Sequence, residues 1–208
     1  VDQANYIEKL VRKEGLADRI RVLCIDWRAI RGKFDRIISV GMFEHVGLKQ
    51  YREFFRRWQE LLADGGLSVL HCIGRVKRAA TDPWTDKYIF PGGYLPTLTQ
   101  IARDSAEADL CVLDVENLRQ HYARTLELWM TNFQDKIDVV SASRGTEFTR
   151  MWSLYLHSSQ AGFRWGDLQL WQTVLAKDHD HPWPLNREVD VRDFTAKQVS
   201  MIDGTNER

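Results

Sequence analysis

The chain has 208 residues, of which 44% are hydrophobic and 28% charged, and its 29 basic residues balance its 29 acidic ones. This composition is typical of one globular domain with a substantial core. The zero net charge gives no support to nucleic-acid binding, which usually needs a basic excess on one face. No apolar run of about 18 residues predicts a membrane-spanning helix, and the opening Val1-Asp2-Gln3 does not resemble a secretory signal.

Three cysteines, Cys24, Cys72 and Cys111, lie in apolar, strand-like surroundings without a CxxC spacing. An odd number of cysteines without such a framework argues against a disulfide scaffold and favours a reducing compartment. We therefore expect a cytoplasmic protein.

The first elements in chain order alternate between helices and strands. Residues 2–15 are rich in helix formers and end at Gly15, a typical stop signal, so they predict a helix. Helical periodicity predicts a second helix over residues 49–62. Short apolar runs predict strands, over residues 21–25, 34–40 and 67–70. A turn is expected at Asp64-Gly65-Gly66, before the third strand. This alternation predicts an α/β domain with a parallel sheet and crossover helices.

After His71 the pattern breaks into a stretch of prolines, glycines and aromatic residues, the lid segment (residues 74–98). A long ordered loop inside a compact domain is usually functional, and we expect this one to form a lid. Beyond it the pattern predicts further elements, a helix over 97–105, a strand over 110–115, helical apolar stripes over 122–133 and 148–156, and a strand over 167–176. Residues 178–208 are polar and aperiodic, which predicts a partly disordered tail.

Ligands of an open parallel sheet bind beyond the carboxyl ends of its strands. The first predicted strand ends at Asp26 and Trp27, where a carboxylate and an aromatic ring suit an adenine. The alternative for Asp26 is a cap of a helix or turn.

The two following strand ends carry Glu44 and His45 in the run GMFEHVG, and His71 in HCIG. Glu44 is equally compatible with the first turn of a helix, where a carboxylate is favourable, and His71 with a hydrogen-bonded core histidine. These three side chains lack a convincing zinc-ligand spacing, so we expect no metal. Spacing by itself does not decide whether Glu44 and His71 are functional or structural.

Longer segments resemble one known family. The segments are FDRIISVGMFEHVGLKQYREFF, LSVLHCIGR, DPWTDKYIFPGGYLPTLTQIA, ENLRQHYARTLELW and GFRWGDLQLWQTVLA. In this order they are similar to cyclopropane-fatty-acyl-phospholipid synthases and mycolic acid cyclopropane synthases, over roughly residues 1–177. FEHVG is moderately specific, because some small-molecule N-methyltransferases have a similar run. DPW…KYIFPGG…LP together with LQLWQ is much more specific.

The resemblance implies a Rossmann-like S-adenosylmethionine-dependent methyltransferase domain over residues 1–177, with the lid segment capping a lipid pocket. Such enzymes transfer a methyl group to a cis double bond of an unsaturated acyl chain. The resulting carbocation loses a proton from the added methyl and closes a cyclopropane ring, with a bicarbonate ion as base. By resemblance, the bicarbonate cradle maps onto Glu44, His71, the backbone of Ile73, and Tyr122. Glu44, His71 and Tyr122 are the expected catalytic residues.

On the cofactor side, Gln3, Asp26 and Trp27 match family positions near the adenosine. The family's glycine-rich loop, its first two strands and a cysteine in that loop have no counterpart here, since Gly65-Gly66 and Gly92-Gly93 lack the strand–turn–helix context. We therefore expect a domain truncated on its N-terminal side that binds cofactor poorly alone.

The expected partners are an unsaturated phospholipid or another acyl-chain substrate, and a homodimer is left open. The basic cluster Arg75, Lys77 and Arg78 indicates either peripheral contact with anionic head groups at the inner face of the membrane or a solvated loop. Two other functions remain open, an amine methyltransferase of the same fold and a non-catalytic remnant that binds lipid or a partner.

Overall fold

The structure, a computed structural model, describes residues 2–179. The described strands form one sheet in the order β1-β2-β4-β3. They are β1 (Phe34–Val40), β2 (Leu62–Arg75), β3 (Cys111–Asn117) and β4 (Leu168–Ala176). The α-helices are α1 (Asp2–Lys13), α2 (Tyr51–Leu61), α3 (Pro83–Tyr88), α4 (Leu98–Ala106), α5 (Arg119–Asp135), α6 (Ile137–Arg144) and α7 (Thr146–Arg164). Three 3-10 turns are η1 (Trp27–Ala29), η2 (Phe43–His45) and η3 (Leu48–Gln50).

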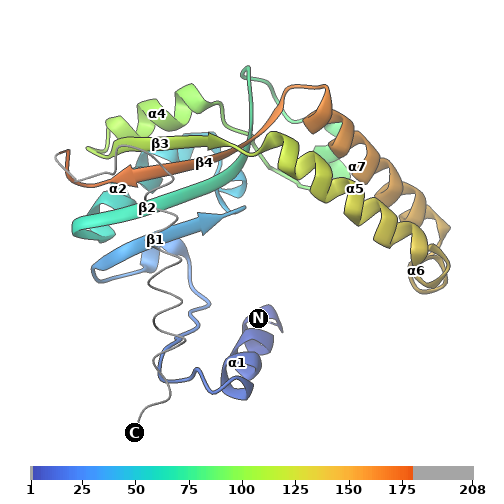
Figure 1. The fold of residues 1–208 in the computed structure, drawn as a ribbon, viewed down its shortest axis with the longest axis horizontal. Coiled ribbons are helices and arrows are strands. Elements are labelled where there is room, and N and C mark those ends of the chain that lie inside the picture. Colours follow the sequence, from blue (N-terminus) through green and yellow to red (C-terminus); the bar gives the residue numbers. More distant parts are fainter. Residues whose placement is uncertain (1, 180–208) are drawn as a thin grey trace, which may run out of the picture.

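The sheet is mixed rather than wholly parallel, which corrects one prediction. β1 pairs with β2 in parallel, as expected. β4 is antiparallel to both of its neighbours, β2 and β3. The reason is the route of the chain: it leaves β3 into the helices α5 to α7, turns back, and re-enters the sheet as β4 between β2 and β3 (Figure 1).

The apolar run 21–25 was predicted as a strand, and this prediction is wrong. These residues form no regular element, and Leu23 and Ile25 are 50% and 51% exposed. A strand exists only where a neighbour accepts its backbone hydrogen bonds, and no described strand pairs with this run. The expected turn at 64–66 lies inside β2, where pairing jumps from Leu62 opposite Phe34 to Leu67 opposite Arg36.

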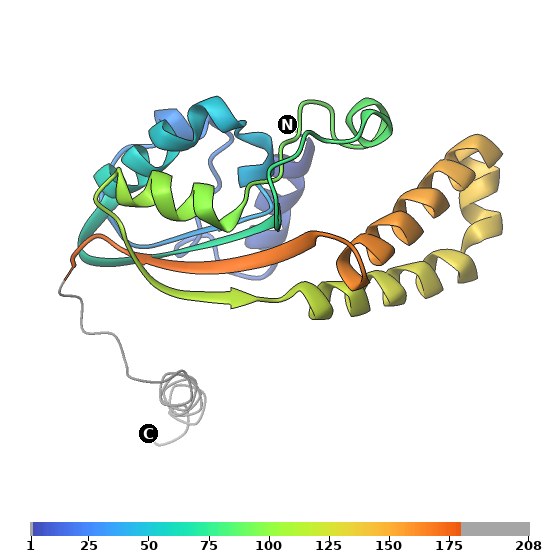
Figure 2. The ribbon, with the colours of Figure 1, turned by 90° about the horizontal axis from the view of Figure 1, so that it is seen from above.

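Helices α2 and α4 cover one face of the sheet (Figure 2). The apolar stripe of α2 supplies most of that core, and Phe43 from η2 stacks on Tyr51 at 4.0 Å between ring centroids. Helix α4 begins at a capping box, in which Thr97 and Gln100 satisfy each other's backbone N–H groups. This packing fixes η2, and with it Glu44, against the end of the sheet.

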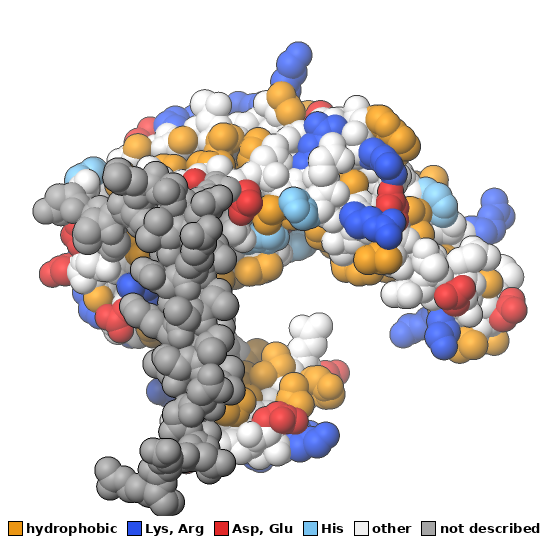
Figure 3. Space-filling view, viewed as in Figure 1, with side chains coloured by type: hydrophobic (Ala, Val, Ile, Leu, Met, Phe, Trp, Pro, Cys, Tyr) orange, Lys and Arg blue, Asp and Glu red, His pale blue; other side chains and the backbone are white. Residues whose placement is uncertain are grey.

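Helices α5, α6 and α7 form an arm that extends beyond the end of the sheet (Figures 1 and 2). A second core joins the arm to the sheet through Leu126, Leu156, Phe163 and Leu170. Helix α1 stands away from the sheet across a wide hollow (Figure 3). No helix in residues 2–179 is long and apolar enough to cross a membrane. The predicted tail lies, from residue 180 onward, outside the described residues.

Candidate functional site

A cavity of about 420 Å³ lies beyond the carboxyl ends of β1 and β2, between the sheet, the lid segment and the arm. Gly41 and Glu44 line it just after β1, and Ile73 lines it from β2. Tyr122 of α5 lines the same cavity. Three of the four residues expected at a bicarbonate site, Glu44, Ile73 and Tyr122, therefore share one space, although they come from three different elements.

The Glu44 carboxylate is buried at the base of this cavity. Its Oε1 accepts a hydrogen bond from the backbone N–H of Ile73 at 2.8 Å, and its Oε2 is buried without a hydrogen-bond partner among the described residues. Burial raises the pKa of Glu44 above its ordinary value, because removal from water penalises the charged form. A carboxyl group in this state can hold a proton and donate it to an anion or polar ligand.

Tyr122 enters the cavity from the first turns of α5. Its ring packs edge-on against Phe163, with 4.8 Å between the ring centroids. Burial is the main cause that raises the pKa of its hydroxyl, followed by the neighbouring Tyr155. The hydroxyl is therefore a neutral hydrogen-bond donor at physiological pH.

His71 lies within β2 and does not line the cavity. The strand continues to Arg75, so His71 is four residues before its end rather than at it. Its Nδ1 is 3.4 Å from Oε1 of Gln172 on the adjacent strand β4. Side chains two residues apart on a strand point to the same face of the sheet. His71 therefore lies on the same face as Ile73, but two residues further from the cavity.

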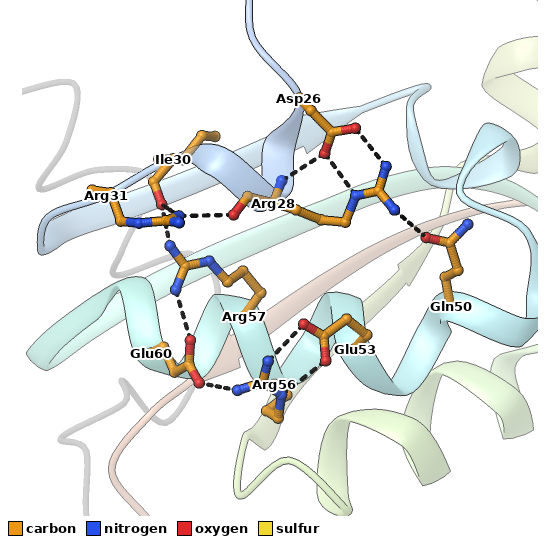
Figure 4. A network of polar contacts seen from close by, with 9 residues as sticks. All are labelled: Asp26, Arg28, Ile30, Arg31, Gln50, Glu53, Arg56, Arg57 and Glu60. Atoms are coloured by element: carbon orange, nitrogen blue, oxygen red, sulfur yellow. Dashed lines mark hydrogen bonds and ion pairs between the residues drawn. The ribbon is translucent and has the colours of Figure 1, made fainter.

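The expected cofactor contacts lie elsewhere. Asp26 caps η1 and accepts three hydrogen bonds from Arg28, at 2.6–2.9 Å, which engage both carboxylate oxygens (Figure 4). These bonds lower the pKa of Asp26 to about 2. Trp27 packs edge-on against Phe54 with a centroid distance of 5.4 Å, and Gln3 is exposed on α1. Trp27 lines a second cavity of about 240 Å³ beside β1 and α2, whereas Asp26 and Gln3 line neither this cavity nor the one that contains Glu44.

Other cavity residues were not singled out from the sequence. Phe90 of the lid segment lies between two rings, 5.7 Å from His45 and 5.9 Å from Tyr155 by their centroids. The arm contributes Tyr155 and Gly162 from α7. In the sequence Phe90 was visible only as part of KYIFPGG, and Tyr155 only as part of a helical stripe, because periodicity does not distinguish a cavity wall from a core.

The chain matches the family model described as mycolic acid cyclopropane synthetase, over residues 1–173. The cyclopropane-fatty-acyl-phospholipid synthase of Escherichia coli (strain K12) is 40% identical over 167 residues, which make up 80% of this chain and 43% of that protein. The chain therefore spans less than half the length of this relative.

Solved structures show the same similarity. The cyclopropane synthase MmaA2 from Mycobacterium tuberculosis superposes with a TM-score of 0.72 at 29% identity, over 80% of this chain and 65% of that one. Mycolic acid cyclopropane synthase CmaA1, complexed with SAH and CTAB, superposes with a TM-score of 0.75 at 28% identity, over 84% of this chain and 66% of that one.

Proposed function

Because the chain belongs to the mycolic acid cyclopropane synthetase family, we propose that the protein transfers a methyl group from S-adenosylmethionine to a cis double bond of an unsaturated acyl chain and closes a cyclopropane ring. Its α/β fold is that of Rossmann-like methyltransferases, as the sequence predicted. The observation that carries the proposal is the cavity in which the buried Glu44 carboxyl and the Tyr122 hydroxyl meet apolar walls.

The walls of the cavity suit an acyl chain. Phe90 and Leu95 come from the lid segment, and Phe163 and Leu168 from the arm and the start of β4. Burial of an apolar chain against such side chains is favourable in proportion to the area removed from water. Aromatic faces near the double bond also stabilise positive charge that develops on the acyl chain.

Bicarbonate, when bound, would supply the base that removes a proton. The residues of the cavity fit such an anion in two respects: Glu44 Oε2 is a buried polar atom without a partner among the described residues, and the Tyr122 hydroxyl is a neutral donor in the same space. We propose that Glu44 and Tyr122 hold the anion, with His71 behind them on β2. The backbone N–H of Ile73 already donates to Glu44, so its role is to orient that carboxyl.

S-adenosylmethionine, when bound, supplies a methyl group on a positively charged sulfur. We propose that Gln3, Asp26 and Trp27 contact its adenosine. Asp26 would then replace some of its hydrogen bonds with Arg28 by hydrogen bonds with the adenosine. The loss of stability should be small, because an exposed ion pair contributes little free energy. The complex of CmaA1 with SAH supports this cofactor. The proposal includes peripheral contact with the membrane that contains the lipid substrate.

The test is an incubation of the full-length protein with methyl-labelled S-adenosylmethionine and vesicles of unsaturated phospholipid. We expect label in the lipid, with a mass gain of one CH2 group and loss of the double bond. Vesicles of saturated phospholipid are the control and should acquire no label. Label that appears only on added amines would replace the proposal with an N-methyltransferase, and the absence of any transfer would favour a lipid-binding protein without catalysis.

A further inference from the structure

The lid segment exposes apolar and basic side chains together. Its exposed large apolar residues are Val76 (59%), Tyr88 (50%) and Phe90 (40%). Its exposed basic residues are Lys77, Arg78 and Lys87. Figure 2 shows the segment standing out from the body as a loop that carries α3. In Figure 3 a basic side chain projects next to hydrophobic ones at the top of the molecule, where Figure 1 places this loop.

The acidic side chains of the same stretch are engaged within the lid segment itself. Asp82 caps α3 by accepting a hydrogen bond from the backbone N–H of Thr85 at 2.9 Å. Asp86 accepts one from the backbone N–H of Gly92, also at 2.9 Å. Both carboxylates thus accept hydrogen bonds from the backbone of the lid segment. Lys77 and Arg78 take part in none of the ion pairs of the described residues. The four basic residues of the lid segment, Arg75, Lys77, Arg78 and Lys87, outnumber these two carboxylates, so the segment has a net charge of +2.

Helix α3 presents an aromatic and basic face. Trp84 and Tyr88 are one turn apart, with 6.0 Å between their ring centroids, and Lys87 Nζ lies 4.9 Å from the centroid of the Tyr88 ring. Thr85, on another side of the helix, lines the catalytic cavity. Aromatic rings with a polar edge and lysines with long apolar stems are the side chains that favour a membrane–water interface.

The lid segment also separates two spaces that suit the two parts of a lipid. On one side is the apolar cavity with Glu44. On the other is an open groove of about 860 Å³, whose charged lining residues are Lys49, Arg78 and Asp86. The two spaces share Thr81 and Gly93, which are joined by a 2.5 Å hydrogen bond from the Thr81 hydroxyl to the Gly93 carbonyl. A lipid can thus place its phosphate beside basic side chains while its acyl chain enters the cavity.

We propose that this outer surface, the lid face (Val76, Lys77, Arg78, Trp84, Lys87 and Tyr88), docks on the surface of an anionic lipid bilayer. The inference rests on the proposed function, because the bilayer is then the source of the acyl chain. The three basic residues attract the anionic head groups, and the aromatic rings enter the interface. Each basic residue near an anionic surface strengthens binding by roughly fivefold, so the three together supply on the order of a hundredfold.

Vesicle co-sedimentation of the full-length protein, without S-adenosylmethionine, tests the docking surface. The vesicles contain phosphatidylglycerol with phosphatidylcholine, or phosphatidylcholine alone. The lid variant carries K77E, R78E and K87E. The control variant carries K136E, R144E and R150E, an equal change of charge at exposed positions around α6, at the far end of the arm.

We expect the wild-type protein and the control variant to bind anionic vesicles equally, and the lid variant to bind at least about tenfold more weakly. Equal binding by the lid variant, or an equal loss in the control variant, overturns the proposal. If circular dichroism shows that the lid variant is unfolded, the K77Q/R78Q/K87Q variant decides by the same criterion. Trp84→Ala should weaken the part of the binding that persists at high salt.

The binding assay needs no turnover, so the two proposals fail separately. A protein that binds anionic vesicles through the lid face but transfers no label retains the docking surface and loses the proposed reaction. A protein that methylates lipid while the lid variant binds vesicles as wild type retains the reaction and loses the docking surface. Vesicles of saturated phosphatidylglycerol should bind as well as unsaturated ones, since docking depends on the head group.

Discussion

Glu44 and Ile73 are joined by a 2.8 Å hydrogen bond from the backbone N–H of β2 to the carboxyl of η2. The bond connects the ends of two parallel strands, since η2 follows β1 directly. It leaves the second carboxyl oxygen of Glu44 buried in the cavity without a partner among the described residues. A buried polar atom without a partner costs free energy, and such costs are characteristic of functional sites.

Glu44→Gln should lower turnover at least about tenfold, because an amide cannot take up and release a proton as a carboxyl group can. The amide oxygen can still accept from Ile73, so the local structure should persist. Kinetics with labelled S-adenosylmethionine and unsaturated vesicles measure the loss. Glu147→Gln, an exposed glutamate on α7, is the control and should act as wild type. Unchanged turnover in Glu44→Gln would exclude the proposed role.

The same variant should alter how stability depends on pH. The folded state raises the pKa of Glu44, so it holds the proton to a higher pH than the unfolded chain does. The stabilising contribution is therefore complete below the ordinary glutamate pKa and is lost as pH rises through the folded-state pKa. Urea unfolding of both proteins, at pH values from below the ordinary glutamate pKa upward, measures the effect. The free energy of unfolding of Glu44→Gln should rise relative to that of the wild-type protein as the pH rises. Parallel curves would contradict the raised pKa.

Tyr122→Phe should also reduce turnover by about tenfold or more, with little loss of stability. The ring that packs against Phe163 is retained, and only the hydroxyl is removed. Tyr155→Phe is the matched comparison in the same cavity, and its effect should be smaller because Ser159 is a hydrogen-bond partner of the Tyr155 hydroxyl. Equal effects of the two substitutions would mean that Tyr122 has no special role.

Gly74→Ala should destabilise the fold by about 1–3 kcal/mol through overpacking. A Cβ at this position would lie 2.5 Å from the carbonyl oxygen of Pro96 and 2.6 Å from Nε1 of Trp171. Gly162→Ala is the comparison, since its Cβ would meet the end of the flexible Leu168 side chain at 2.7 Å and should cost less. Chemical denaturation measures both. A smaller loss for Gly74→Ala than for Gly162→Ala would contradict the packing argument.

Local patterns in the sequence were sufficient for most elements. The aromatic stripe of α2 has the spacing of one helical face, and it forms the core as predicted. β1 and β4 were recognisable as apolar or alternating runs of strand length. Helix α6 was not predicted, because its apolar residues Val139 and Val140 lie at the end of the arm and form no clear stripe.

The same local patterns failed wherever pairing partners decided the outcome. The run 21–25 has strand-like composition, yet no described neighbour accepts its hydrogen bonds. His71 was placed at a strand end because the apolar run stops there, but β2 continues to Arg75 by pairing with β4. Asp26 was expected to be a cofactor contact or a cap; the structure shows it capping η1 with Arg28 as its partner, and its contact with a cofactor stays a prediction.

The sequence by itself determined the class of the fold, the order of its main helices and strands, and, through the motifs around Glu44 and LQLWQ, the family. These depend on residue spacing along the chain. Only the tertiary structure decided that the sheet is mixed and that Glu44, Ile73 and Tyr122 share a cavity from which His71 is set back. It also decided that Lys77, Arg78, Lys87 and Tyr88 of the lid segment are exposed. The physical reason is that strand pairing and side-chain convergence join residues far apart in the chain, whose meeting no local pattern encodes.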